Sequence, residues 1–250
     1  MRLVSLNTWK GDGDYPRRLK AMAEGLASLS PDLIALQEDV RTDDGRIHTA
    51  QTLAQALGLH LIWLPARAKH RQVGPHVEAS TSGFAVLSRE PILEQRVLTL
   101  PDDPRDGQRL AQCVQLPWAL GGGWLINLHL THLPDRPDLR QAQLWHVVNE
   151  LSVWAVDERW LLCGDFNAGP ADPELAVCLW PSGPLNDVFS GVHKLTHVDA
   201  MGRGVNLDQI FWRTPPGRGL TVHRAWVALD QPHENGVRAS DHSAVCADLF

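Results

Sequence analysis

Apolar and polar positions alternate along the chain with two different periods. Short apolar runs bounded by turn residues predict strands at 3–8, 33–36, 59–64, 83–88, 92–100, 109–116, 124–130, 160–163, 207–212, 221–227 and 243–249. Apolar residues three or four positions apart predict helices at 15–29, 49–57 and 137–156. Several strands follow one another without an intervening helix. This order predicts an α/β (α+β) fold with two packed β-sheets flanked by helices.

Length and composition favour one domain over residues 1–250, because no linker or shift in composition divides the chain. With 44% hydrophobic residues, a chain of 250 residues can bury well over half of its unfolded surface without disulfides. The four cysteines are far apart, and no CxxC pair occurs. We therefore expect buried, reduced thiols and no cysteine-bound zinc.

The sequence predicts a cytoplasmic protein that does not insert into a membrane. The apolar stretch before Asn7 is too short for a signal peptide. Residues 110–133 contain no charged Asp, Glu, Lys or Arg, but their polar residues and glycines fit two strands joined by a turn better than a membrane span. The net charge of −6 argues against binding nucleic acid by overall charge alone, although a local basic patch stays open. No feature of the sequence indicates a protein partner.

Polar side chains follow the predicted strands at the points where those strands end. A carboxylate in such a place is partly desolvated, which is costly unless a cation or hydrogen-bond donors compensate it. A capped turn or a buried ion pair explains any single case, but the repetition predicts one shared polar pocket. The residues are Asn7, Glu38, His129, Asp165, Asn167, Asp208, Asp241 and His242.

The types of these residues indicate a chemistry. Oxygen ligands suit Mg²⁺ or Mn²⁺. Asp165 and Asn167 lie two positions apart and share one face if the backbone is extended. His242 cannot share a strand face with its neighbour Asp241, so we expect it to pair with a remote acid such as Asp208. An Asp–His pair with a divalent cation is typical of phosphoester hydrolysis.

Seven short motifs occur in an order that resembles the endonuclease/exonuclease/phosphatase superfamily, including its deoxyribonuclease-like and sphingomyelinase-like metal-dependent phosphohydrolases. They are SLNTW (5–9), ALQED (35–39), SGFAVLSR (82–89), INLHLTH (126–132), GDFNAGP (164–170), NLDQIFW (206–212) and SDHSAV (240–245). Each motif alone is weak evidence, but together they span nearly the whole chain. The resemblance implies a four-layer α/β sandwich built around two mixed sheets.

The resemblance also implies roles for the metal and phosphate ligands. Glu38 resembles the principal metal ligand, with support from Asn7, and Asp241 would lie at this metal or hold a second one. Asn167 would donate to a phosphate oxygen. His242 would bind the scissile phosphate.

Three further roles complete the implied site. Asp165 resembles the group that orients or deprotonates the attacking water, and Asp208 would orient His242. His129 stands where the deoxyribonuclease-like and sphingomyelinase-like branches carry a histidine. The apurinic-endonuclease branch usually has a tyrosine there, so the histidine disfavours repair of abasic sites.

A basic segment precedes the strand predicted at 83–88. We expect it to be an exposed loop, which also holds Gly74 and Pro75. It is either a solvated connector or a phosphate-binding rim of the pocket. Its candidate rim residues are Arg67, Lys69 and Arg71, with His70 and His76 beside them.

Several other polar and aromatic residues remain secondary candidates. His132 and His197 could line the pocket, but exposed or structural roles are favoured. Arg140 and Gln143 are interpreted as structural, holding their helix against the strand-end loops. Core packing is the default for the ten tryptophans, with substrate stacking left open at two of them, Trp9 and Trp212.

The sequence thus predicts a Mg²⁺- or Mn²⁺-dependent phosphoester hydrolase, with a phosphodiesterase favoured. Its substrate is either a nucleic acid or a small phosphodiester. Two alternatives are a phosphomonoesterase acting on a small metabolite or lipid headgroup, and a catalytically silent binding module of the same fold. The silent module is disfavoured because every implied catalytic residue is present.

Overall fold

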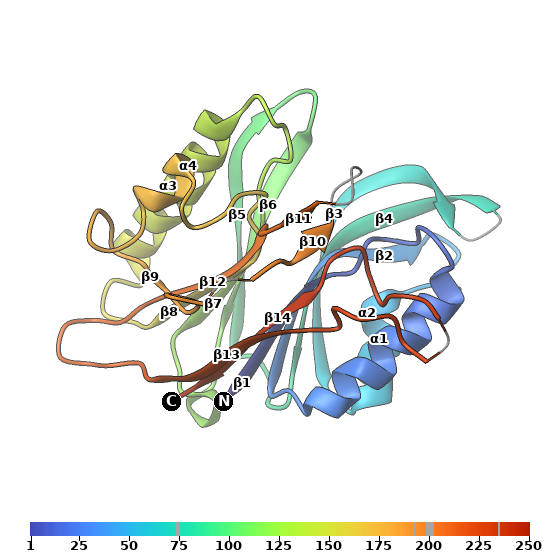
Figure 1. The fold of residues 1–250 in the computed structure, drawn as a ribbon, viewed down its shortest axis with the longest axis horizontal. Coiled ribbons are helices and arrows are strands. Elements are labelled where there is room, and N and C mark those ends of the chain that lie inside the picture. Colours follow the sequence, from blue (N-terminus) through green and yellow to red (C-terminus); the bar gives the residue numbers. More distant parts are fainter. Residues whose placement is uncertain (74–75, 193, 199–202, 235) are drawn as a thin grey trace.

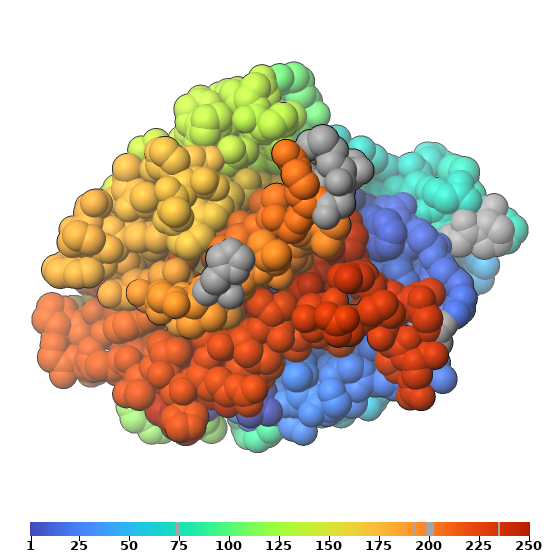
Figure 2. Space-filling model, viewed as in Figure 1, coloured from blue at the N-terminus to red at the C-terminus, as the bar shows by residue number. Residues whose placement is uncertain are grey.

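Two six-stranded β-sheets pack face to face, with helices on both outer faces (Figure 1). The computed structural model describes residues 1–73, 76–192, 194–198, 203–234 and 236–250. Both sheets are mixed, as the sequence predicts. The last third of the chain, orange to red in Figure 2, runs across one face of the molecule and links its two sides.

The first sheet has the strand order β13-β14-β1-β2-β4-β3. Its central pair, β1 and β2, is parallel and is connected by a helix, whereas all other neighbours are antiparallel. The strands are β1 (Arg2–Asn7), β2 (Leu33–Thr42), β3 (His60–Val73), β4 (His76–Ser88), β13 (Val222–Ala228) and β14 (Ala244–Leu249).

The second sheet repeats this pattern in the order β5-β6-β7-β8-β12-β9. Here β7 and β8 form the parallel pair, again connected by a helix. The strands are β5 (Glu94–Asp103), β6 (Gly107–Gln115), β7 (Trp124–His129), β8 (Trp160–Asp165), β9 (Asn186–Asp187) and β12 (Asp208–Arg213). A separate small pair joins β10 (His197–Val198) and β11 (Gly204–Val205).

The helices cover the outer faces and complete four layers. On the first sheet lie α1 (Tyr15–Leu29) and α2 (Thr49–Leu57), and their buried faces share a core with β1, β2 and β4. On the second sheet lie α3 (Pro137–Trp154) and the short α4 (Pro173–Ala176). A third core fills the space between the sheets. The predicted bounds of α1 and α2 are confirmed, because Ser30 and Gly58 end them in left-handed conformations.

The prediction of a loop at Arg67, Lys69 and Arg71 is wrong. These residues belong to β3, which pairs with β4 from His60↔Ser88 to Val73↔His76. The backbone ladder keeps this polar segment extended, although hydrophobic periodicity gives no signal for a strand whose faces are both polar. Gly74 and Pro75 lie outside the described residues.

All four cysteines are buried and free, as expected. Among the described residues, no helix combines the length and the apolar character needed to cross a membrane.

Candidate active site

A polar cavity of about 420 Å³ lies where the two sheets meet. Side chains from both sheets line it, together with residues from the loops that follow their strands. Nearly all of the predicted site residues face this cavity, namely Asn7, Glu38, Arg67, Lys69, Arg71, His129, Asp165, Asn167, Asp241 and His242.

The register of three neighbouring strands aligns an acid–imidazole row, which we define as His129, Asp165 and Asp208. His129 at the end of β7 pairs with Asp165 at the end of β8, and Asp165 pairs with Asp208 at the start of β12. The row therefore crosses the edge of the second sheet from strand to strand. Its geometry follows directly from backbone pairing.

Asp208 holds His242 against this row, and His242 is counted as its fourth member. The Nδ1 atom of His242 lies 2.8 Å from Oδ2 of Asp208, and both side chains are buried. This contact confirms the predicted pairing of the two residues. His197 stacks beside His242, with ring centroids 4.5 Å apart, and its Nδ1 lies 3.1 Å from the Asp241 carbonyl oxygen.

Asp165 is surrounded by polar groups from four segments. Its Oδ2 accepts a hydrogen bond from Asn7 Nδ2 at 3.0 Å and lies 3.5 Å from His129 Nε2 and 3.7 Å from His242 Nε2. Its Oδ1 accepts a bond from the backbone N–H of Asn167 at 2.9 Å. The Nδ2 group of Asn167 donates to the Leu130 carbonyl, which fixes its amide at the cavity wall.

Burial and charge shift the protonation equilibria of the row. Burial raises the pKa of Asp165, and the nearby Asp208 carboxylate raises it further, although His242 opposes this. Burial lowers the pKa of His242, but the Asp208 and Asp165 carboxylates outweigh it and raise this pKa to about 10. Burial, aided by Arg109 and Lys10, holds the pKa of His129 well below its usual value. The site thus combines a neutral imidazole, a charged imidazole and a carboxylate of raised basicity.

The sequence predicts Glu38 at the end of a strand. In the structure, Glu38 instead enters the cavity from a bulge within β2. The register of β2 and β4 shifts between Leu36 and Asp39, and Glu38 itself has a φ of 56°. A β-bulge redirects side chains in this way. The strand then continues to Thr42, so the acid interrupts β2 and does not end it.

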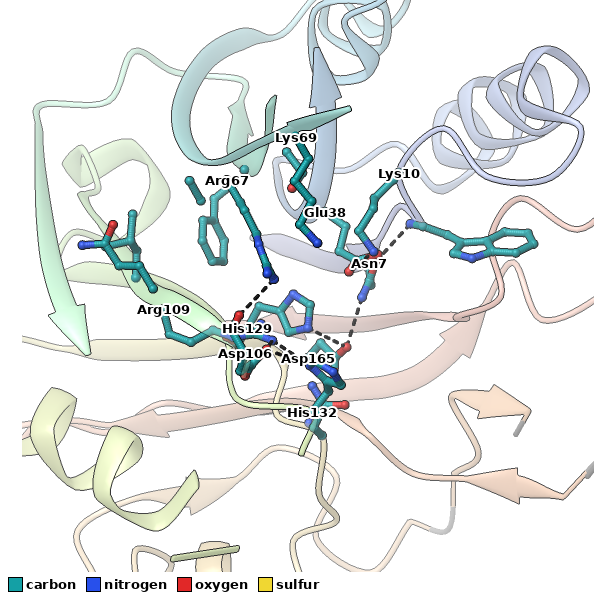
Figure 3. A pocket seen from close by; sticks show the side chains of 18 of the residues that line it. Asn7, Lys10, Glu38, Arg67, Lys69, Asp106, Arg109, His129, His132 and Asp165 are labelled. Atoms are coloured by element: carbon teal, nitrogen blue, oxygen red, sulfur yellow. Dashed lines mark hydrogen bonds and ion pairs between the residues drawn. The ribbon is translucent and has the colours of Figure 1, made fainter. Parts of the chain in front are cut away.

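Lys10 compensates the Glu38 carboxylate. Its Nζ lies 2.6 Å from Oε1 of Glu38, and both side chains line the cavity. Figure 3 shows Lys10, Glu38 and Asn7 close together above Asp165. A cation is therefore accommodated at the acid that the sequence predicts to be the principal metal ligand.

The donor set around Glu38 fits a hard divalent ion. Glu38, Asn7 and Asp241 offer oxygen atoms to the same cavity, and Mg²⁺ usually takes only one or two carboxylates beside water and phosphate. Among the described residues, two tighter clusters also bring three possible ligand atoms within 4.8 Å of one another: His197–Asp241–His242 and Asp165–Asp208–His242. The site therefore has the chemistry of a metal site without cysteine.

Left-handed backbone conformations concentrate at the cavity. Trp9, Lys10, Glu38 and Asn167 have φ values of 54°, 43°, 56° and 52°, and all four line it. Such conformations are costly for residues other than glycine and are often found at functional sites.

Arg18 of α1 supports two of these strained residues. Its buried guanidinium donates to the carbonyl oxygens of Thr8, Trp9, Lys10, Asp12 and Ala239. It thereby ties the loop after β1 to the segment that leads to Asp241 and His242.

A cationic wall, formed by Arg67, Lys69 and Arg71 of β3, faces the row across the cavity. Arg67 donates to the Asp106 carbonyl, and Arg71 donates to the Arg67 and Ser80 carbonyls and to the Ser82 hydroxyl. Among the described residues, no carboxylate pairs with the three cations. Burial and the neighbouring positive charges lower the pKa values of Lys69 and Arg71.

Sequence reasoning missed Lys10, Asp106 and Arg109, all of which line the cavity. Asp106 is buried between Arg109 and His132, whose Nδ1 lies 2.8 Å from its Oδ1. Asp106 sits in a turn between β5 and β6, so no apolar run pointed to it. Lys10 follows the SLNTW motif directly, and this proximity was the one available signal.

The secondary candidates separate clearly. His132 lines the cavity with its ring more than half exposed, and Trp9 lines it as well, whereas Trp212 faces a different surface groove. Arg140 pairs with the buried Glu174 and donates to the Leu133 carbonyl.

Gln143 accepts a hydrogen bond from the backbone N–H of Thr131. Both Arg140 and Gln143 thus hold α3 against the loop after β7, in agreement with the structural interpretation.

Comparisons with known proteins agree with this architecture. The model of the endonuclease/exonuclease/phosphatase family matches residues 4–242, so the chain belongs to that family. A search of curated proteins gives no significant match.

Several solved structures share the fold. An endonuclease/exonuclease/phosphatase family protein from Leptotrichia buccalis has a TM-score of 0.76 at 18% identity, with 100% of this chain and 99% of that one covered. D. rerio TDP2 complexed with a single-strand DNA product has a TM-score of 0.78 at 18% identity, with 100% and 98% covered. A protein of unknown function from Enterococcus faecalis has a TM-score of 0.72 at 17% identity, with 100% and 99% covered.

Proposed function

We propose that this protein is a Mg²⁺- or Mn²⁺-dependent phosphodiesterase. The observation that carries the proposal is the position of Asp165. Its Oδ2 faces the Nε2 of His242 across 3.7 Å, while Asp208 holds the opposite ring nitrogen of that histidine. Both side chains line the same cavity, and a carboxylate beside a charged imidazole suits the attack of water on a phosphate.

Each residue of the site has a distinct task in this proposal. Asp165 accepts the proton of the attacking water, and Asn7 fixes the orientation of its carboxylate. His242 donates to a non-bridging phosphate oxygen, where negative charge increases in the transition state. Neutral His129 and the Asn167 amide offer further donors. As water adds to phosphorus, the bond to the leaving oxygen breaks, and this oxygen takes a proton from solvent and departs as an alcohol.

Glu38 and Asn7, with Asp241 nearby, would hold the divalent ion. When bound there, the ion polarises the phosphate and stabilises the leaving oxygen. Membership of the family and the oxygen-rich donor set support this assignment. The Lys10 ammonium lies 2.6 Å from Glu38, so this carboxylate has a cationic partner in the structure.

For the substrate, we propose a nucleic-acid strand. The cationic wall supports this choice, because cations without carboxylate partners favour a ligand that carries more than one phosphate. The similar D. rerio TDP2, which was solved with a single-strand DNA product, adds support at the level of a shared fold. Small phosphodiesters and phosphomonoesters remain alternatives that a substrate panel distinguishes.

We further propose that residues 1–250 act as one catalytic domain in the cytoplasm. Both sheets contribute side chains to the cavity, so neither forms the site alone. The four unpaired cysteines support a reducing compartment.

A panel of substrates, each assayed with Mg²⁺, Mn²⁺ or EDTA, tests the proposal. The panel contains bis(4-nitrophenyl) phosphate, single- and double-stranded DNA, RNA, phosphoinositides, sphingomyelin and small phosphomonoesters. We expect metal-dependent turnover of diesters, with single strands among the best substrates. Preferred cleavage of monoesters would replace the phosphodiesterase by a phosphatase, and no turnover at all would favour a binding module.

A further inference from the structure

A second cleft, of about 480 Å³, opens beside the catalytic cavity. Trp9 and Asp241 line both spaces, so the two adjoin at these residues. The cleft lies against the loop after β1, and the residues of the proposed mechanism account for little of its lining. A substrate that places its phosphate in the cavity can therefore extend a second group into the cleft.

The indole of Trp9 is held rigidly at this junction. The Arg18 guanidinium stacks on the ring, 4.6 Å from its centroid, and also donates to the Trp9 carbonyl at 3.0 Å. Gly13 packs so closely that a Cβ atom there would lie 3.1 Å from the ring. The backbone N–H of Trp9 donates to Oδ1 of Asn7 at 3.0 Å, which ties this residue to the catalytic centre.

The remaining lining adds an apolar surface at the mouth of the cleft. Val198 is 45% exposed, and Val237 lines the same space. The charged groups Asp14, Arg18, Arg238 and Asp241 carry balanced charges. The cleft is thus neutral and partly apolar, whereas the cationic wall on β3 attracts anions.

We propose that this cleft is a subsite for a nucleobase attached to the scissile phosphate, with Trp9 as its stacking platform. The inference rests on the proposed function, because it requires that the cavity takes the phosphate. The observations favour a flat aromatic group over an alkyl chain, since a fixed indole offers a planar surface and the cationic wall selects polyanions. Stacking of one base on an aromatic side chain changes affinity about tenfold or more.

Matched ligands isolate the contribution of the base. Adenosine 5′-monophosphate and ribose 5-phosphate differ only in the base, and adenosine 3′-monophosphate covers the opposite strand polarity. Their dissociation constants are measured by calorimetry in the presence of Mg²⁺, with octyl phosphate as the alkyl probe. We expect at least one adenosine monophosphate to bind about tenfold or more tightly than ribose 5-phosphate.

Variants connect this preference to the cleft. Trp9→Ala should reduce the ratio of the two dissociation constants to below about threefold, and Trp9→Phe should retain most of it. Val198→Asp changes an exposed position in the cleft and leaves Trp9 intact. This variant should also reduce the ratio of the two dissociation constants, which gives a test independent of any change at Trp9. Trp118→Ala removes a tryptophan that is 84% exposed and lies outside both spaces, so it should keep the wild-type ratio.

The outcomes separate this inference from the proposed function. Equal affinities of wild-type protein for the adenosine monophosphates and ribose 5-phosphate would overturn the base subsite, even if diesters are hydrolysed. An unchanged ratio in both Trp9→Ala and Val198→Asp, or tightest binding of octyl phosphate, would also overturn it. A Trp9-dependent preference for the base without any hydrolysis would support the cleft and refute the phosphodiesterase.

Discussion

The acid–imidazole row and the cationic wall face the same cavity but are built in opposite ways. In the row, Asp165, Asp208 and His242 are buried, and the side chain of His129 is only 12% exposed. Each contacts another side chain of the site, as in the 2.8 Å contact of His242 with Asp208. In the wall, Arg67 and Arg71 bond mainly to carbonyl oxygens, and Lys69 is exposed. Three strands of one sheet fix the row, whereas a single strand at the edge of the other sheet carries the wall.

Under the proposed function, the row and the wall have different roles. Buried and mutually bonded groups keep one geometry and act on charge that develops during the reaction. Cations at an open edge without carboxylate partners act on charge that the substrate already carries. Changes in the row should therefore reduce kcat, and changes in the wall should raise KM.

The largest effect is expected in the row. Asp165→Asn and His242→Ala should each lower kcat by at least about 10²-fold, because each removes an interaction with the reacting atoms. Steady-state kinetics on bis(4-nitrophenyl) phosphate measures this, and circular dichroism checks that the fold is retained. If either variant turns over at the wild-type rate, its residue has no part in the chemistry.

The pH dependence of the row gives the next prediction. Burial alone would lower the pKa of His242, and Asp208 is the strongest of the influences that instead raise it to about 10. In Asp208→Asn this influence is removed, so the pKa of His242 falls and its protonated form disappears at lower pH. The basic limb of the kcat/KM profile should therefore move to lower pH. A basic limb that stays in place would show that His242 does not set it.

A smaller effect is expected in the wall. The triple change Arg67→Ala, Lys69→Ala and Arg71→Ala should raise KM for a single-stranded oligonucleotide about tenfold more than for a mononucleotide diester. The slope of log affinity against log salt should fall by about 2, because each neutralised phosphate of a single strand contributes roughly 0.7 to this slope.

Lys20→Ala serves as the control for the wall, because it removes an exposed cation on α1 outside the cavity. It should keep the wild-type salt slope. If the triple change alters KM equally for the oligonucleotide and the mononucleotide diester, the wall is only a solvated edge of the sheet. The nucleic-acid proposal then loses its local support.

The smallest effect is expected outside the cavity. Trp212 lines a different groove, and Trp212→Phe should leave kcat/KM within about twofold of wild type. The assay is the same as for the row. A larger loss would show that the groove around Trp212 takes part in substrate binding, contrary to the geometry.

The same contrast explains what the sequence predicted. The row lies at the ends of short apolar strands, and a buried strand that ends in an acid or imidazole is easy to recognise. The pairing of Asp208 with His242 was predicted because side chains alternate along a strand, so His242 cannot share a face with its neighbour Asp241. The helices at 15–29 and 49–57 were predicted with their bounds, because Ser30 and Gly58 mark their ends.

The wall and the surroundings of Glu38 were predicted less well. The polar residues of β3 carry no hydrophobic period, so the segment resembles a loop unless its pairing with β4 is known. The bulge at Glu38 depends on one extra residue opposite β4, which no local pattern reveals. Lys10 and Asp106 reach the cavity only through tertiary contacts.

A metal titration of phosphodiesterase activity tests the central claim most directly. Wild-type protein, Glu38→Gln and Asp165→Asn are depleted of metal with EDTA, and turnover of bis(4-nitrophenyl) phosphate is followed as Mg²⁺ or Mn²⁺ is restored. We predict saturable recovery in wild type, a requirement for at least about tenfold more ion in Glu38→Gln, and a low plateau in Asp165→Asn. Turnover that persists in EDTA, or a Glu38→Gln titration identical to that of wild type, would contradict the account.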